Sequence, residues 1–229
     1  MKKKRMFAFL LAGCCLLTGC AGASQDGEPA GESPEAQQSG LVQSAEPGQA
    51  AGMDEAYIDF AGRSALELID RYENLIVVQT FSKARSMAGM RIGYAVSNPV
   101  LIKYLNDAKY SFNSYTMNQA ALVCGVEAVK DKEYFEEGVR KIIETREWAK
   151  ERLAELGFSC LDSSANFIFA RHPRYDAKEL FEALKANGIY VRYWGSARIE
   201  QYMRITVGTR EEMEALFAFL EKYIRSGNA

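Results

Sequence analysis

Two kinds of hydrophobic pattern alternate along the second part of the chain. Residues 75–78 and 92–96 are short apolar runs, which predict strands buried on both faces of a sheet. Residues 115–129 and 134–156 are longer segments that predict two helices. Gly157 directly follows the second of these, and we expect it to end that helix as a left-handed C-cap.

The alternation continues towards the C-terminus. Further strands are expected at residues 158–161, 166–170, 189–193 and 202–207. From residue 133 onward the order of elements is therefore α, β, β, α, β, β, α. This order predicts a small α/β domain in which helices pack on one face of a sheet.

Capping boxes mark the starts of the last two helices. Asp176 and Glu179 form the first box, and Gly188 is expected to end the helix that it opens. Thr209 and Glu212 form the second box. The apolar residues that follow it fall on one helical face, as expected of a helix packed on a core: Met213, Leu216, Phe217, Leu220 and Ile224.

The first 52 residues follow different patterns. Basic residues 2–5 precede an apolar stretch at 6–17, which is too short to span a bilayer and predicts a secretion signal. It ends in Leu-Thr-Gly-Cys20, which resembles the lipobox of bacterial lipoproteins and implies a lipidated Cys20 at the mature N-terminus. A buried apolar helix is the alternative. Residues 21–52 hold five acidic and no basic side chains and predict a disordered linker.

Composition narrows the classes of function. The 229-residue chain is 48% hydrophobic with a net charge of −2, so it can bury a core and gives no electrostatic reason to bind nucleic acid. Cys124 and Cys160 do not make a disulfide framework, and we expect both to be buried thiols. His172, the only histidine, is expected in a surface turn, and no cluster predicts a metal site.

The segment TFSKARSMAGMRIGY, residues 80–94, carries the candidate chemistry. Lys83 follows a predicted buried strand, and ligands of open α/β sheets bind where such strands end. Burial and a nearby cation would favour a nucleophilic amine at Lys83. Ser82 and Arg91 are suitable donors to phosphate oxygens. These groups suit pyridoxal 5'-phosphate, a phosphorylated aldehyde.

Upstream, the sequence Asp54-Glu-Ala-Tyr57 supplies two further groups that this cofactor needs. A carboxylate would keep the ring nitrogen protonated, and a tyrosine hydroxyl would hold the ring oxygen. Taken singly, these signals have simpler interpretations: a lysine after a strand is commonly a solvated charge, and Asp-x-x-Tyr is commonly a turn.

Taken in order, the motifs DEAYIDF, TFSKARSMAGMRIGY, SANFIFAR and YMRITVGT resemble the histidinol-phosphate aminotransferases, fold type I pyridoxal-phosphate enzymes. The resemblance extends from about residue 53 to residue 224. It implies an α/β fold: a partial large domain with the lysine-bearing strands, then a small C-terminal α/β domain. The threonine-phosphate decarboxylases share much of the pattern and are the second choice.

The resemblance also implies roles for individual residues. Lys83 would form the Schiff base with the cofactor and transfer protons, while Asp54 and Tyr57 would hold the ring. Ser82 and Arg91 would bind the cofactor phosphate. In the small domain two arginines would bind a small amino-acid substrate: Arg204 its carboxylate and Arg192 its phosphate.

The chain is expected to have four parts: a signal at residues 1–20, a linker at 21–52, a remnant of the large domain at 53–132 and the small domain at 133–229. The first half of the family's chain has no counterpart, and we expect no strand before Asp54. Three hypotheses follow: a transaminase that needs a complementing N-terminal half or a second copy as in the family's dimers, a lipid-anchored binding module, and a rearranged reading frame. The signal predicts a membrane-anchored, extracytoplasmic location, and the family's chemistry predicts the cytoplasm if the signal is unused.

Overall fold

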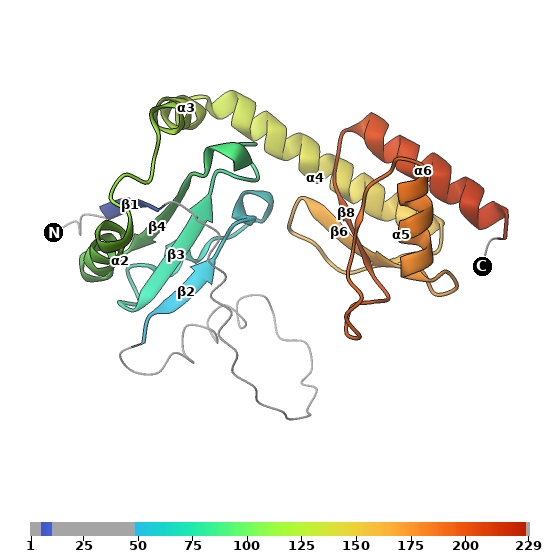
Figure 1. The fold of residues 1–229 in the computed structure, drawn as a ribbon, viewed down its shortest axis with the longest axis horizontal. Helices are drawn as coiled ribbons and strands as arrows, with labels where there is room; N and C mark the ends of the chain where they lie inside the picture. Colours follow the sequence, from blue (N-terminus) through green and yellow to red (C-terminus); the bar gives the residue numbers. More distant parts are fainter. Residues whose placement is uncertain (1–5, 11–48, 228–229) are drawn as a thin grey trace. The chain divides into compact units, whose positions relative to one another are not determined.

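The computed structural model describes the backbone of residues 6–10 and the whole of residues 49–227 (Figure 1). The described chain divides into two compact units. The first unit contains the chain up to Ile58 together with Arg63–Asp131, and the second contains Asp59–Gly62 together with the chain from Lys132 onward. A mixed α/β architecture of this kind confirms the predicted fold class.

A four-stranded sheet forms the centre of the first unit. Its strands are β1 (Met6–Leu10), β2 (Ala51–Asp54), β3 (Leu75–Thr80) and β4 (Gly93–Ser97), in the order β1-β4-β3-β2. β2 runs parallel to β3, whereas β4 is antiparallel to both β3 and β1. Leu75 and Val77 of β3 are fully buried with Val96 of β4, which agrees with the apolar runs that predicted these two strands.

β2 corrects one prediction. We expected no strand before Asp54, yet the backbone from Ala51 pairs with β3, so that Ala51 lies opposite Leu75 and Asp54 opposite Val78. The strand also begins inside the range expected to be a linker. Alanine and glycine have low strand propensity, and here the ladder with the well-formed strand β3 decides the conformation.

Short 3-10 helices and two α-helices complete the described part of the first unit. The 3-10 helices are η1 (Ile58–Phe60), which crosses into the second unit, η2 (Ala65–Leu68) and η3 (Ala88–Met90). The α-helices are α2 (Pro99–Phe112) and α3 (Gln119–Lys130). α2 was not predicted from the pattern, and the helix expected from residue 115 begins only at Gln119. Asn98 caps α2 through Val100 N and Leu101 N, and Asn118 caps α3 through Ala121 N.

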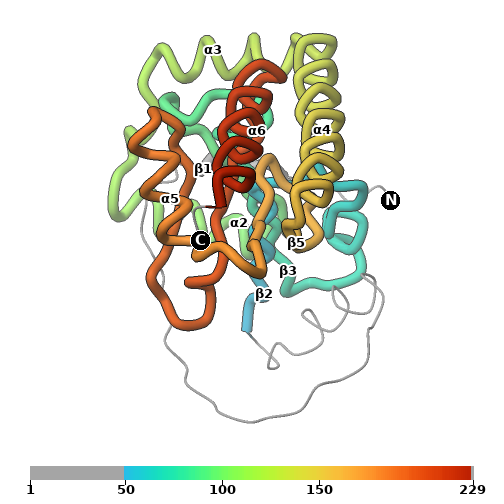
Figure 2. The backbone as a smooth tube through the Cα atoms, turned by 90° about the vertical axis from the view of Figure 1, so that its right-hand side faces the viewer, coloured from blue at the N-terminus to red at the C-terminus, as the bar shows by residue number. Residues whose placement is uncertain are grey.

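The second unit is a sheet with three helices. Its elements are α4 (Lys132–Glu155), β5 (Ser159–Cys160), β6 (Phe167–Arg171), α5 (Ala177–Ala186), β7 (Arg192–Tyr193), β8 (Met203–Thr206) and α6 (Arg210–Arg225). The strands are antiparallel neighbours in the order β5-β6-β8-β7. α4 and α6 lie side by side (Figure 1, Figure 2). Ile168 and Ile205 of the sheet join Leu153, Leu184 and Leu220 of the helices in one core, as the predicted order of elements requires.

Helix ends in the second unit follow their local sequence. Thr209 accepts from Glu212 N while the Glu212 side chain accepts from Thr209 N, a complete capping box. Asp176 caps α5. Gly157 has φ +85° and Gly188 has φ +77°, the left-handed conformation predicted for both positions.

His172 and the cysteines correct two further predictions. His172 is only 6% exposed, packed between the rings of Phe158 and Tyr175, so its side chain points inward although Pro173 and Arg174 beside it form an exposed bend. Cys124 is exposed and Cys160 half-buried, where both were expected to be buried. Burial raises the pKa of the Cys160 thiol.

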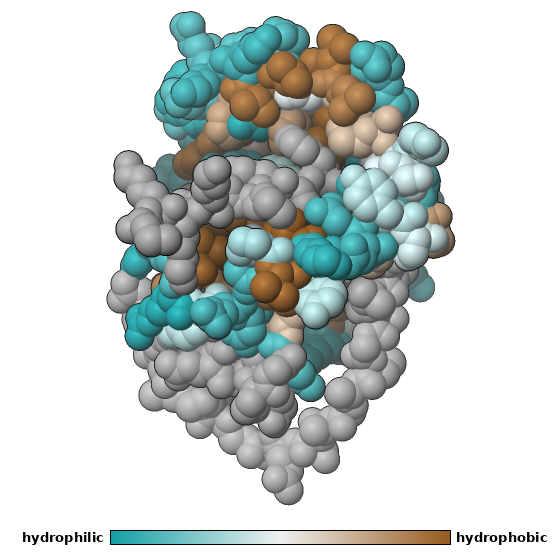
Figure 3. All heavy atoms as spheres, turned by 90° about the vertical axis from the view of Figure 1, so that its left-hand side faces the viewer, coloured by the Kyte–Doolittle hydropathy of each residue, from teal (hydrophilic) through white to brown (hydrophobic). Residues whose placement is uncertain are grey.

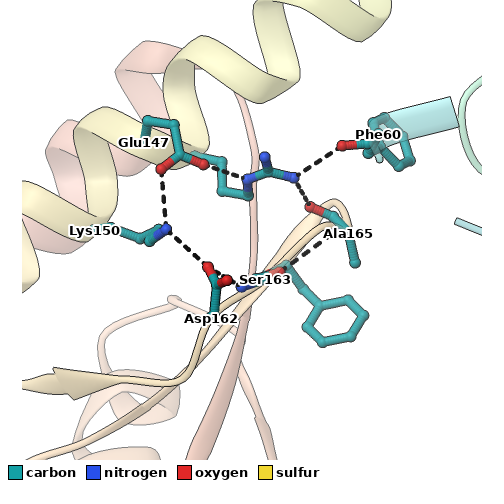
Figure 4. Close-up of polar contacts among 8 residues, drawn as sticks. Phe60, Glu147, Lys150, Asp162, Ser163 and Ala165 are labelled. Atoms are coloured by element: carbon teal, nitrogen blue, oxygen red, sulfur yellow. Dashed lines mark hydrogen bonds and ion pairs between the residues drawn. The ribbon is translucent and has the colours of Figure 1, made fainter. Parts of the chain in front are cut away.

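Arg146 of α4 ties residues from three segments of the second unit together (Figure 4). Its side chain is buried, and Nη1 donates to the carbonyl oxygens of Phe60 at 3.5 Å and Ala165 at 3.0 Å. Nε donates to Glu147 at 2.8 Å. Burial tends to raise the pKa of Glu147, but hydrogen bonds from Arg146 and Lys150 outweigh it and hold that pKa below its ordinary value. These contacts explain why residues 59–62 belong to the second unit.

Some predictions fall on parts of the chain that the structure does not describe. Cys20, the rest of the predicted signal apart from the backbone of β1, and the linker up to residue 48 lie outside the described residues. Within the described ranges, 6–10 and 49–227, no helix has the length and apolar character needed to cross a membrane. The same ranges contain no group of acidic, histidine or cysteine side chains suited to a metal ion.

Candidate functional site

The connection between β3 and β4 is a closed loop that carries the predicted lysine. Phe81 N donates to Ile92 O at 3.1 Å, and Met87 N donates to Phe81 O at 3.1 Å. These bonds hold Ser82 and Lys83 directly after β3. Because β2 is parallel to β3, the carboxyl ends of both strands lie at the same edge of the sheet, where α/β proteins bind ligands.

Two residues of this loop have left-handed backbone conformations although neither is glycine. Ser86 has φ 54° and Arg91 has φ 56°. Such conformations are costly for residues with a Cβ and persist where the surrounding structure imposes them, often at functional sites. Arg91 is exposed, and its guanidinium donates to Ala88 O at 3.0 Å.

Lys83 and Tyr57 meet in the structure. Lys83 Nζ lies 5.4 Å from the centroid of the Tyr57 ring, within the range of a cation–π contact. Both side chains are half-buried. Twenty-five residues separate them along the chain, so the fold brings parts of the two motifs close together in space.

The other predicted cofactor residues lie at the same edge of the sheet. Asp54 ends β2, is exposed, and accepts from Ala56 N at 3.0 Å in a tight turn. The hydroxyl of Ser82 lies 2.8 Å from that of Thr80, and Ser82 N donates to Thr80 Oγ1 at 3.1 Å. A carboxylate, an amine, hydroxyls and a guanidinium are thus presented by two adjacent strand ends and one closed loop.

Sequence reasoning missed Glu55, which lies between the two predicted ring-binding residues. Its carboxylate is buried and accepts hydrogen bonds from Ser64, from Ala65 N and from the amide of Gln79. The available signal was an acidic residue beside Asp54 at the end of a strand, where alternation points its side chain towards the interior.

The second unit presents the two predicted substrate arginines. Arg192 of β7 and Arg204 of β8 are paired across the strands, on the sheet face opposite Met203 and Ile205, which are buried in the core. Both guanidinium groups lie over the Trp194 ring, at 5.2 Å for Arg192 and 5.5 Å for Arg204.

Arg204 lines a pocket that lies wholly within the second unit. The pocket has a volume of about 460 Å³, and its apolar walls include Phe167, Phe169 and Trp194. Arg204 Nε is buried without a hydrogen-bond partner among the described residues. Buried donors are normally satisfied, so the geometry suits an anionic group that enters this pocket.

Comparison with known proteins assigns the chain to a class. The profile described as "Aminotransferase class I and II" matches residues 51–220. The chain therefore belongs to the class I and II aminotransferase family.

Within that family, histidinol-phosphate aminotransferases are close relatives. One from Brachyspira hyodysenteriae is 53% identical over 173 residues, which are 75% of this chain and 49% of the relative. One from Lactococcus lactis is 47% identical, over 76% of this chain and 48% of the relative. A solved histidinol-phosphate aminotransferase from Sinorhizobium meliloti, in complex with pyridoxal-5'-phosphate, is 30% identical with a TM-score of 0.69, over 77% of this chain and 49% of that one. These matches confirm the resemblance noted in the sequence, and the chain spans about half the length of the curated relatives it matches.

Proposed function

We propose that this chain supplies the lysine-bearing half of a pyridoxal-phosphate-dependent aminotransferase, which transfers an amino group between histidinol phosphate, or a similar amino acid, and 2-oxoglutarate. The observation that carries the proposal is the contact between Lys83 and Tyr57 at the carboxyl ends of β2 and β3. High identity to histidinol-phosphate aminotransferases supports this substrate class over that of the related decarboxylases.

The donor set fits the proposed cofactor. A primary amine is the group that condenses with an aldehyde, and Lys83 holds its amine beside an aromatic ring at a strand end. When bound, pyridoxal phosphate supplies an electron sink for the substrate carbon and carries the amino group between the two half-reactions. Asp54 would hold a proton on the ring nitrogen, and the Tyr57 hydroxyl would donate to the ring oxygen. Ser82 and Arg91 would donate to the phosphate.

The arginines of the second unit would select the substrate. Guanidinium groups bind carboxylate and phosphate oxygens through paired donors. Arg204, with its unsatisfied Nε, would take a carboxylate of 2-oxoglutarate, and Arg192 the phosphate of histidinol phosphate. Lys83 would then move the proton that leaves the substrate Cα, since the condensing lysine is freed when a substrate amine takes its place.

Exposed apolar surface on the first unit supports the need for a second polypeptide. α3 exposes Leu122, Val123, Val126 and Val129, and apolar side chains gather over this helix at the top of Figure 3. β2 is the last strand of its sheet among the described elements, so its outer edge is unpaired there. Large exposed apolar patches and open sheet edges mark interaction surfaces. The expected partner is a polypeptide equivalent to the first half of the relatives, or a second copy of this chain.

Lysine trapping tests the proposal. The chain and its Lys83→Ala and Lys83→Arg variants would be incubated with pyridoxal phosphate, reduced with borohydride and mapped by peptide analysis. The same samples would be assayed with histidinol phosphate and 2-oxoglutarate, with and without the N-terminal half of the Brachyspira relative. We expect weak trapping at Lys83 in the chain alone, and turnover only when the half is added, because preorganised non-covalent contacts are needed to hold the cofactor.

Three results would contradict the proposal or a part of it. If pyridoxal phosphate is trapped on surface lysines to the same extent in Lys83→Ala, Lys83 is not a cofactor-binding lysine. Specific trapping at Lys83 without turnover, even with the complementing half, would favour a binding module over an enzyme. Tight binding and turnover by the chain alone would show that no complementing half is required.

We also propose that Cys20 is lipidated and anchors the chain on the extracytoplasmic side of a membrane. The charge and apolar pattern of residues 2–17 and the sequence Leu-Thr-Gly-Cys20 support this location. Metabolic lipid labelling should be lost in Cys20→Ser, and labelling that persists in this variant would remove the proposal.

A further inference from the structure

Glu55 makes three hydrogen bonds in the interior of the first unit. The residue is only 8% exposed. Its carboxylate accepts from Ser64 Oγ at 2.6 Å, from Ala65 N at 2.6 Å and from Gln79 Nε2 at 2.8 Å. All three donors are neutral, and they come from the start of η2 and from β3.

Gln79 extends this connection to the next strand. Gln79 of β3 and Tyr94 of β4 are paired in register, and the Tyr94 hydroxyl donates to Gln79 Oε1. The rings of Tyr94 and Phe81 pack in a T-shaped arrangement, with centroids 6.0 Å apart and planes at 88°. The contacts therefore run from the end of β2 across β3 and β4 to the first residue of the lysine loop.

The burial of Glu55 is linked to the directions in which the side chains of Asp54 and Tyr57 point. Successive side chains of a strand face opposite sides, so burial of Glu55 leaves Asp54 exposed at the same strand end. Tyr57 follows two residues later and lies beside the Lys83 amine. The segment from Asp54 to Tyr57 changes direction within four residues. The Glu55 side chain fixes it by a hydrogen bond from Gln79 of β3. β3 ends at Thr80, three residues before Lys83.

We infer that Glu55 is a positioning residue for the lysine site: it holds the segment from Asp54 to Tyr57 against β3 and thereby places the Tyr57 ring at the Lys83 amine. Its role in cofactor binding rests on the proposed function, whereas its role in holding this segment does not. No direct contact of Glu55 with cofactor or substrate is implied.

The test compares three variants of the full chain, by two measurements without cofactor and by borohydride trapping of pyridoxal phosphate. Glu55→Ala removes the carboxylate that accepts the three hydrogen bonds. Glu55→Gln keeps an amide oxygen that can accept from Ala65 N. Its NH2 group can donate to Gln79 if the Gln79 amide rotates by 180°. Glu67→Ala is the matched control, because Glu67 is exposed on η2 and pairs only with exposed Arg63 in the contacts described. Two measurements are made: hydrogen exchange of the Ala65 amide, and acylation of Lys83 by acetic anhydride relative to exposed Lys178.

We expect Ala65 exchange to rise about tenfold in Glu55→Ala, as loss of one buried hydrogen bond predicts. Acylation of Lys83 should rise about threefold as its aromatic contact is lost, with Lys178 unchanged. Glu55→Gln should stay within about twofold of wild type in both measurements, a rescue that general destabilisation would not give. Borohydride trapping of pyridoxal phosphate at Lys83 should fall in Glu55→Ala and be retained in Glu55→Gln.

Equal behaviour of Glu55→Ala and Glu67→Ala would overturn the inference. If Glu55→Ala does not fold, Tyr94→Phe breaks the far end of the same connection while keeping the ring, and Lys83 acylation must then rise in that variant. If the wild-type chain fails to trap cofactor at Lys83, the proposed function fails, while the exchange and acylation results still decide whether Glu55 positions this segment.

Discussion

Two residues with buried polar side chains, Glu55 and His172, lie in surroundings that the sequence did not predict. Glu55 is satisfied by three neutral donors. His172 is held between Phe158 and Tyr175, and its Nδ1 accepts from Arg174 N at 3.1 Å. These two buried side chains are tolerated because their hydrogen bonds are made inside the protein.

His172 should make the stability of the second unit depend on pH. Burial, the largest cause, lowers the pKa of His172, and a backbone hydrogen bond with Leu156 opposes this only in part. The unfolded chain therefore takes up a proton near pH 6.5, before the folded protein does. The free energy of unfolding should be highest above that pH and should fall as the pH drops towards the lower, folded-state pKa.

Urea unfolding at pH 7.5 and pH 5.5 measures this dependence, and His172→Gln is the control. Because His172 is the only histidine in the chain, the variant should lose most of the difference between the two pH values. An equal difference in the variant would assign it to carboxylates instead.

At the scale of elements, two helical glycines have opposite surroundings. A Cβ on Gly125 of α3 would lie 2.9 Å from Ile92 Cδ1, whereas a Cβ on Gly138 of α4 would have no atom within 4 Å. The first glycine allows α3 to lie close to the end of the lysine loop. The second has no packing role in the described contacts.

Alanine substitution should separate the two positions. Gly138→Ala should stabilise α4 by up to about 1 kcal/mol, because alanine has the higher helix propensity. Gly125→Ala should lose this gain, since Ile92 is buried and must move to make room. Hydrogen exchange of the two helices measures both effects, and a similar stabilisation at both positions would contradict the packing argument.

At the scale of the whole molecule, the two units have unequal cores. Among the residues whose side chains the structure describes, the second unit has a single cluster of sixteen buried hydrophobic residues. Those of the first unit form separate clusters of five, two and three, a set that includes no side chain before residue 49. One contiguous hydrophobic core stabilises a domain more than several small clusters do. We therefore expect the first unit to unfold at a lower denaturant concentration than the second.

Unfolding in urea should therefore occur in two steps that different probes separate. Both tryptophans, Trp148 and Trp194, lie in the second unit, so tryptophan fluorescence reports that unit alone. Hydrogen exchange of β3 should be lost at lower urea than the fluorescence change. A single transition by both probes would show that the two units unfold together.

The sequence alone was sufficient wherever neighbouring residues determine the conformation. Thr209, Asp176, Gly157 and Gly188 set helix ends through contacts within a few residues, and the structure has each of them as predicted. The order of strands and helices after residue 132 followed from periodicity, since apolar spacing reports which face is buried. The motif around Lys83 likewise identified the family before any fold was known.

The tertiary structure decided whatever depends on partners distant in the chain. β2 is a strand because β3 pairs with it, although its own residues favour no strand. α2 was not predicted, and of its residues only Ile102 is buried in the structure. Burial of His172, the anchor at Glu55 and the contact of Tyr57 with Lys83 arise from segments brought together by folding. Local sequence cannot encode such contacts, because their free energy belongs to pairs of residues and exists only once the chain has folded.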